Sequence, residues 1–204
     1  MAITSNTQNT ILDIFHSKVK TTKTINNITL VILGSLLLTI SAKISIPFIG
    51  VPATFQTMVV AAIAAAFGWR LGVATVALYL MQGIMGLPVF AYGGGAAYLF
   101  GPTGGFLLGF LPAALVIGKL ANMGFSKNFF SLFLAMLIGT TIIFAFGFAW
   151  LVTLASSVSW IDQSNIIASA FAIAIKPFII WDILKMALAA ITITGAWALI
   201  KSKK

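Results

Sequence analysis

Two charged residues, Asp182 and Lys185, stand near the start of the last long apolar run of the chain. A charge in the core of a bilayer costs at least about 2.5–3.5 kcal/mol on insertion scales, so such a group indicates a function and a defined partner. The two residues are three positions apart, and that spacing places them on one face of a helix. A carboxylate only accepts hydrogen bonds and an ammonium only donates them. The pair therefore predicts a site for a polar group that carries both N–H and C=O.

The pair also has a plainer interpretation, as an ion pair at the membrane interface. A lysine near the end of a span can extend its ammonium to water while its stem stays in the apolar layer. Lys185 lies about a turn and a half into the predicted span 179–200, at a rise of about 1.5 Å per residue, which favours the binding interpretation. The remaining acidic residues are Asp13 and Asp162, there is no Cys, and His16 is the single histidine. This inventory supplies neither thiol chemistry nor a set of metal ligands, so neither an enzyme nor a cofactor is expected.

The composition is that of a polytopic membrane protein. Of 204 residues, 60% are hydrophobic and 7% are charged, whereas about a quarter are charged in a soluble domain. Each span needs about 20 residues, and shorter apolar runs are tolerated when they are tilted or covered by neighbours. The sequence predicts an all-α, six-helix transmembrane bundle over residues 28–200, with spans at about 28–42, 57–67, 71–86, 106–121, 129–154 and 179–200.

The basic residues predict how this bundle is oriented in the cell membrane. Only Gly68-Trp69-Arg70 separates the second and third spans, which predicts an antiparallel hairpin. With the polar tail 1–27 in the cytoplasm, nine basic residues lie inside and only Lys43 and Lys176 lie outside. The basic C-terminus 201–204 is then also cytoplasmic. A short interfacial helix is expected at 11–19. The basic residues are scattered and no recognition motif accompanies them, so no nucleic-acid partner is expected.

The connection 87–105 is apolar yet rich in glycine. Irregular backbone cannot face lipid, but it can lie at membrane depth where it covers a cavity. The glycines Gly93, Gly94 and Gly95 would let the backbone approach a ligand closely. Aromatic side chains would wall an apolar pocket and still offer hydroxyl groups. The segment is predicted to be a lid, with a plain flexible loop as the alternative; its aromatic residues are Phe90, Tyr92, Tyr98 and Phe100.

Two glutamines are further candidates. Gln56 falls in the first turn of the second helix, after the N-cap candidate Thr54, and whether it faces the cavity is open. Gln82 lies mid-helix, three residues after Tyr79, and hydrogen bonding between helices is favoured over ligand contact there.

Four segments together resemble one family. They are Val51-Pro-Ala-Thr-Phe-Gln-Thr57, Gly86-Leu-Pro-Val-Phe-Ala91, Gly101-Pro-Thr-Gly-Gly105 and Asp182-Ile-Leu-Lys185. In this order they resemble BioY proteins, the biotin-specific substrate-binding (S) components of energy-coupling-factor (ECF) transporters, over about residues 40–195. The resemblance implies a six-helix S-component fold, both termini in the cytoplasm, and biotin as the transported ligand near the outer face.

The resemblance also implies that Asp182 and Lys185 belong to the biotin site. The ureido ring of biotin carries two N–H donors and one carbonyl on a largely apolar bicycle. We expect Asp182 to accept a ureido N–H, and Lys185 to balance that carboxylate and donate to a ligand oxygen. Whether this oxygen is ureido or carboxylate is open.

The implied partners are a transmembrane coupling subunit and two ATPase subunits, with a solitary or oligomeric BioY as the alternative. S components of this class commonly dock through small residues of the first helix, and this chain offers Ser35 and Thr39 in place of an Ala-x-x-x-Ala pattern. The alternative functions are an S component for another vitamin and a membrane assembly protein without transport activity.

Overall fold

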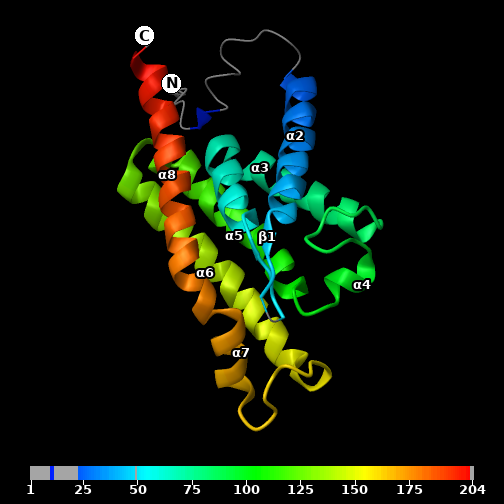
Figure 1. The fold of residues 1–204 in the computed structure, drawn as a ribbon. Coiled ribbons are helices and arrows are strands. Elements are labelled where there is room, and N and C mark those ends of the chain that lie inside the picture. Colours follow the sequence, from blue (N-terminus) through cyan, green and yellow to red (C-terminus); the bar gives the residue numbers. More distant parts are fainter. Residues whose placement is uncertain (1–9, 12–22, 49, 203–204) are drawn as a thin grey trace, which may run out of the picture.

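The structure, a computed structural model, describes residues 10–11, 23–48 and 50–202, and most of them form a helical bundle (Figure 1). Within this part of the chain, five helical segments are long and apolar enough to cross a membrane, one of them being Ile166–Ile200. The all-α, multi-pass prediction is thus confirmed. The long helices are α2 (Lys23–Lys43), α3 (Gln56–Ile84), α5 (Gly104–Asn122), α6 (Phe129–Thr153) and α8 (Ile179–Ser202), and the shorter ones are α4 (Ala96–Leu99) and α7 (Ile166–Ala174).

The difference between six predicted spans and five observed segments lies in α3. Its backbone leaves the helical conformation at Gly68, where φ is 77°, a left-handed value that favours glycine. A Cβ placed on Gly72 would lie 3.0 Å from the Cα of Ala64, so the two arms of α3 pack against each other. The predicted hairpin is therefore present, but only Gly68 departs from helical geometry, so α3 includes both arms.

The arms of α3 and helix α5 form the centre of the bundle. Val60, Ala64, Ala113 and Ala114 are fully buried there. Small residues allow backbones to approach closely in a membrane protein, where lipid tails are as apolar as the side chains. Gly118 is one such position, because a Cβ there would lie 2.4 Å from the Cα of Trp69. This tight centre holds the first turn of α3 and the wall of α5 in fixed positions.

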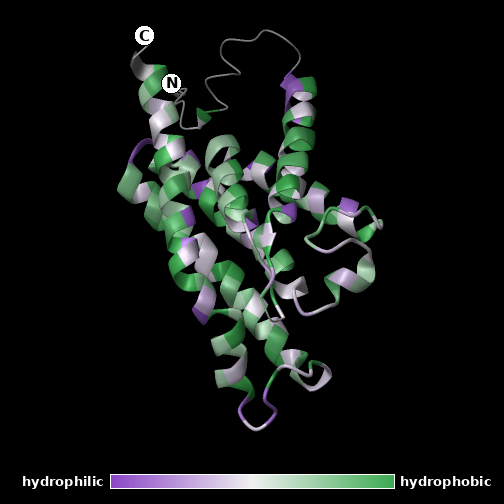
Figure 2. Cartoon of the chain, viewed as in Figure 1, coloured by the Kyte–Doolittle hydropathy of each residue, from purple (hydrophilic) through white to green (hydrophobic). Residues whose placement is uncertain are grey.

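The surface of the bundle fits a membrane environment. Helix α2 is peripheral, and seven of its large apolar side chains are more than a third exposed: Ile25, Ile28, Ile32, Leu33, Leu36, Leu37 and Ile40. Apolar residues cover the helices, whereas polar residues gather at helix ends and loops, most clearly in the loop before α7 (Figure 2). α2 begins and α8 ends at the same end of the molecule (Figure 1), as an even number of crossings requires.

A small antiparallel hairpin follows α2. Its strands are β1 (Ser45–Ile46) and β2 (Ala53–Thr54), with Ser45 opposite Thr54. The sequence predicted only a loop here, since two-residue strands leave no alternation to detect. Helix α2 begins at Lys23 rather than at residue 28, because the helix continues into polar residues that an apolar run does not mark. All of the predicted interfacial helix 11–19 except Ile11, most of the tail 1–27, and residues 203–204 lie outside the described residues.

Candidate binding site

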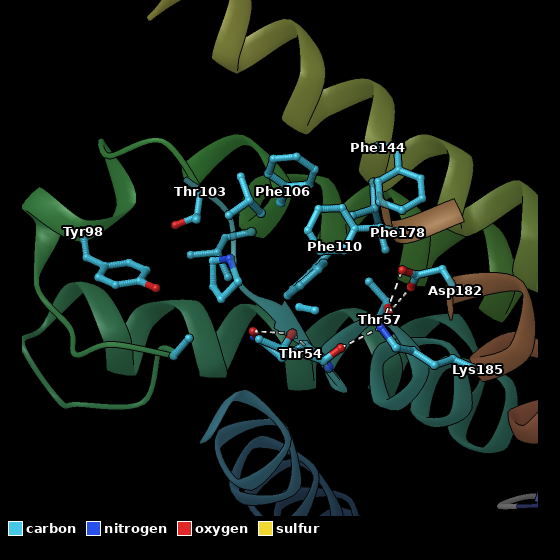
Figure 3. A pocket seen from close by; sticks show the side chains of 17 residues that line it. Thr54, Thr57, Tyr98, Thr103, Phe106, Phe110, Phe144, Phe178, Asp182 and Lys185 are labelled. Carbon is cyan, nitrogen blue, oxygen red and sulfur yellow. Dashed lines mark hydrogen bonds and ion pairs between the residues drawn. The ribbon is translucent and has the colours of Figure 1, made fainter. Parts of the chain in front are cut away.

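A cavity lies between the β1–β2 hairpin, the start of α3, and helices α5, α6 and α8. It encloses about 570 Å³ of space, part of it open to solvent. Tyr98 stands at one end and the pair Asp182–Lys185 at the other, with phenylalanine rings between them (Figure 3). The cavity thus has phenylalanine rings along one wall, polar groups at both ends, and Thr54 and Gln56 in its lining as well.

The charged pair lies in the wall of this cavity. Asp182 is 3% exposed, and its Oδ2 lies 3.5 Å from Lys185 Nζ. Thr57 Oγ1 donates a hydrogen bond to Asp182 Oδ1. Lys185 Nζ also donates to the backbone oxygen of Thr54, at 2.8 Å, which ties α8 to β2. A buried charge is tolerated when it is paired and hydrogen-bonded, and both charges meet that condition here.

A chain of hydrogen bonds continues from Thr54 into the bundle. Thr54 Oγ1 donates to Gln56 Oε1 at 3.1 Å, and Gln56 Nε2 donates to the Tyr79 hydroxyl at 2.8 Å. That hydroxyl donates to the backbone oxygen of Val89, at 3.1 Å. Gln56 also lines the cavity. This answers the question, left open by the sequence, of whether Gln56 faces the cavity. Tyr79 pairs with Gln56 and not with Gln82, whose buried Oε1 has no hydrogen-bond partner among the described residues.

The aromatic wall differs from the one expected. Of the four aromatic residues of 87–105, only Tyr98 lines the cavity. Phe90 is fully buried behind Tyr98, whereas Tyr92 and Phe100 are 60% and 67% exposed. The wall is instead built by side chains of α5, α6 and the turn before α8, namely Phe106, Phe110, Phe144 and Phe178. In the sequence, the spacing of Phe106 and Phe110, one helical turn apart, was the feature that could have indicated an aromatic face of α5.

The glycine-rich segment lies beside the cavity rather than over it. Gly93, Gly94 and Gly95 do not line the cavity, although the neighbouring Ala91 does. Gly95 N donates to Gly83 O at 2.6 Å, which fastens the segment to the end of α3. Burial raises the pKa of Tyr98, and a hydrogen bond with Thr103 acts in the opposite direction. The structure thus places Asp182, Lys185, Gln56 and Tyr98 around one cavity, and leaves Tyr92 and the three glycines out of its lining.

Thr57 was missed by the sequence reasoning. A threonine in an apolar helix usually bonds to its own backbone, so its type alone gave no signal.

Ser35 and Thr39 were predicted to dock a partner. Ser35 is fully buried within this chain and Thr39 is half-buried, each bonded to α2's own backbone.

The sequence profile of the BioY family matches residues 13–202. This chain belongs to the BioY family. The biotin transporter BioY of Thermotoga maritima is 39% identical over 157 residues, covering 76% of this chain and 86% of the relative. Biotin transporter BioY2 of Lactococcus lactis subsp. cremoris is 33% identical over 169 residues, covering 81% and 86%.

One solved structure has the same fold. It is the crystal structure of the S-component for biotin from an ECF-type ABC transporter, and it superimposes with a TM-score of 0.74 at 24% identity. The match covers 88% of this chain and 95% of the other. The predicted S-component fold is thus confirmed for this BioY protein.

Proposed function

We propose that this chain takes up biotin across the cell membrane, as the substrate-binding transmembrane subunit of an ECF-type transporter. Its BioY relatives are named biotin transporters, and it spans most of their length. The observation that carries the proposal is the pair of buried Asp182 and partly buried Lys185 at one end of an aromatic cavity. That pair offers an acceptor and a donor to the ureido group, and the phenylalanine rings offer apolar contacts to the bicycle.

In this proposal, Asp182 accepts a ureido N–H. A carboxylate can accept about four hydrogen bonds, and the two described ones come from Thr57 and Lys185. Biotin can therefore bind Asp182 without displacing either neighbour. Lys185 donates to a ligand oxygen with its third N–H, since the other two serve Thr54 O and Asp182. Gln56 and Tyr98 supply further polar atoms along the same wall.

The remaining parts of the machinery are proposed on the same basis. No phosphate-binding G-x-x-x-x-G-K-[ST] motif occurs in the sequence, so energy would come from two ATPase subunits through a transmembrane coupling subunit. A solitary or oligomeric form is the alternative. Both termini lie in the cytoplasm. Docking through Ser35 would require α2 to shift, because that side chain is buried.

Binding of labelled biotin to the purified chain in detergent, with competitors, tests this function. We expect a nanomolar dissociation constant, about −12 kcal/mol of binding free energy. Unlabelled biotin and desthiobiotin should displace the label, since both carry the ureido ring, whereas thiamin and riboflavin should not. Displacement by thiamin or riboflavin would favour an S component for another vitamin. A folded, monodisperse sample that binds no vitamin would favour the membrane assembly protein.

A further inference from the structure

We propose that Lys43, at the end of α2, is a positioning residue for the cavity: it holds segment 87–90 in place and thereby fixes Tyr98 in the cavity wall. This inference rests on the proposed function only in taking biotin as the ligand. The contacts that support the inference are all between residues of this chain.

The first observation is a long-range contact of the Lys43 ammonium. Lys43 Nζ donates to the backbone oxygen of Phe90 at 2.6 Å, across 47 residues of sequence. Hydrogen bonds with a charged donor are shorter and about twice as strong as neutral ones. The one salt bridge among the described residues joins Lys185 to Asp182. The hydrogen-bond partner of the Lys43 ammonium is therefore a backbone carbonyl and not a carboxylate.

The second observation is that the neighbouring carbonyl, Val89 O, is held by a different element, α3. The Tyr79 hydroxyl donates to Val89 O, and Gln56, which lines the cavity, donates to that hydroxyl. Two consecutive carbonyls are thus fixed, one by a hydrogen-bond chain from the cavity and one by the end of α2. A segment held at both carbonyls has little freedom to rotate its peptide planes. Segment 87–90 is thus held at two points, by Tyr79 of α3 and by Lys43 of α2.

The third observation connects this segment to the cavity. The Phe90 ring is fully buried and stacks on Tyr98, with ring centroids 5.0 Å apart and planes at 29°. Its other neighbour is Tyr79, edge-on at 5.5 Å. Gly83 makes room for the ring, since a Cβ there would lie 2.0 Å from it. A shift of the Phe90 backbone would therefore move Tyr98, whose side chain lines one end of the cavity (Figure 3).

A simpler role for Lys43 would be a membrane anchor. Lysines at span ends often extend to the interface, and a cation in the last turn of a helix also favours the helix dipole. An anchor needs only the charge near the interface, whereas a positioning residue needs the hydrogen bond to Phe90. The two roles predict different effects on ligand release and on local backbone opening.

The test compares Lys43→Met with Lys43→Arg and Lys176→Met. Lys176 is the other basic residue of the predicted outer side, is exposed, and is not in the cavity wall. Two quantities are measured: the dissociation rate of labelled biotin, and amide hydrogen exchange of the ligand-free protein. Lys43→Met should speed biotin release about tenfold, the size of one lost hydrogen bond to a charged group. Lys43→Arg should stay within about twofold, and Lys176→Met should match the wild type.

Amide exchange separates this inference from the proposed function. In Lys43→Met, exchange should rise in 87–98 and stay unchanged in α6, and this holds even if the wild type binds no biotin. Equal behaviour of the two Met variants in both measurements would overturn the positioning role, as would a uniform rise in exchange across all helices. If Lys43→Met does not purify as a monodisperse sample, Lys43→Leu, which also lacks a donor, replaces it, with the same local rise in exchange expected and the same outcomes decisive.

Discussion

Asp182 is held by Thr57 of α3 and by Lys185 of its own helix, and Lys185 in turn bonds to β2. Thr57 comes from the first turn of α3, and Lys185 links back to β2 through Thr54 O. The sequence could indicate only an i,i+3 contact within α8. The structure adds contacts from this pair to α3 and β2. Each member of the set is expected to affect ligand affinity through the position and charge of Asp182.

Replacing Thr57 by Val tests this arrangement without changing the shape of the side chain much. The variant loses the hydroxyl that donates to Asp182. We expect biotin affinity to fall about tenfold, since a hydrogen bond to a charged group is worth about 1.5–3 kcal/mol. Thr57→Ser keeps the hydroxyl and should bind nearly as the wild type does. Equilibrium binding in detergent measures both, and equal affinity of Val and Ser variants would argue against the contact.

Tyr79 should matter for stability as well as for binding. Tyr79→Phe leaves Gln56 Nε2 without its acceptor and Val89 O without its side-chain donor, both in a buried region. An unsatisfied buried group costs about 1–3 kcal/mol, so the thermal unfolding temperature in detergent should fall. Tyr92→Phe is the matched control, because Tyr92 is 60% exposed. A fall of the same size in the control would show that the effect is not specific to the buried chain.

Small residues set the distances between the helices. α5 approaches the α3 turn through Gly118, and α3 accommodates Phe90 through Gly83. Apolar runs and one glycine-centred turn were enough to predict the helices and the hairpin of α3. They could not predict the aromatic wall, because which of the 17 phenylalanines face the cavity depends on helix rotation and packing partners. The β1–β2 pairing was equally hidden, since strands of two residues leave no alternation to detect.

Gly83 offers a test of this packing. In Gly83→Ala the added methyl would lie 2.0 Å from the Phe90 ring, so the ring and its neighbour Tyr98 must move. Overpacking of this kind costs about 1–3 kcal/mol, and both stability and biotin affinity should fall. Gly195→Ala, with no atom within 4 Å of the new Cβ, should be neutral or slightly stabilising. A neutral Gly83→Ala variant would contradict the tight contact between α3 and Phe90.

The distribution of basic residues along the whole chain predicts an orientation in the membrane with both termini in the cytoplasm. The connection 155–165 lies at the end of the bundle away from the start of α2 and the end of α8 (Figure 1). The chain contains no Cys, so single cysteines can report sidedness without a background.

Two exposed positions suit this experiment, Ser157 before α7 and Met123 after α5. A membrane-impermeant maleimide should label Ser157→Cys in intact cells, and should label Met123→Cys only after permeabilisation. Labelling of both from outside, or the reverse pattern, would contradict cytoplasmic termini.

If biotin binds at Asp182, replacing this aspartate should weaken binding, and replacing an exposed aspartate should not. Asp182→Asn keeps the shape of the side chain and removes its charge. Asp162→Asn makes the same change in an exposed loop, where hydrogen bonds from Ser164 hold the pKa of Asp162 below its usual range, so the control also removes a full charge. Equilibrium binding of labelled biotin should weaken about 10–100-fold in Asp182→Asn, through the lost charged acceptor, and stay unchanged in Asp162→Asn. Wild-type affinity in a folded Asp182→Asn protein would contradict the claim.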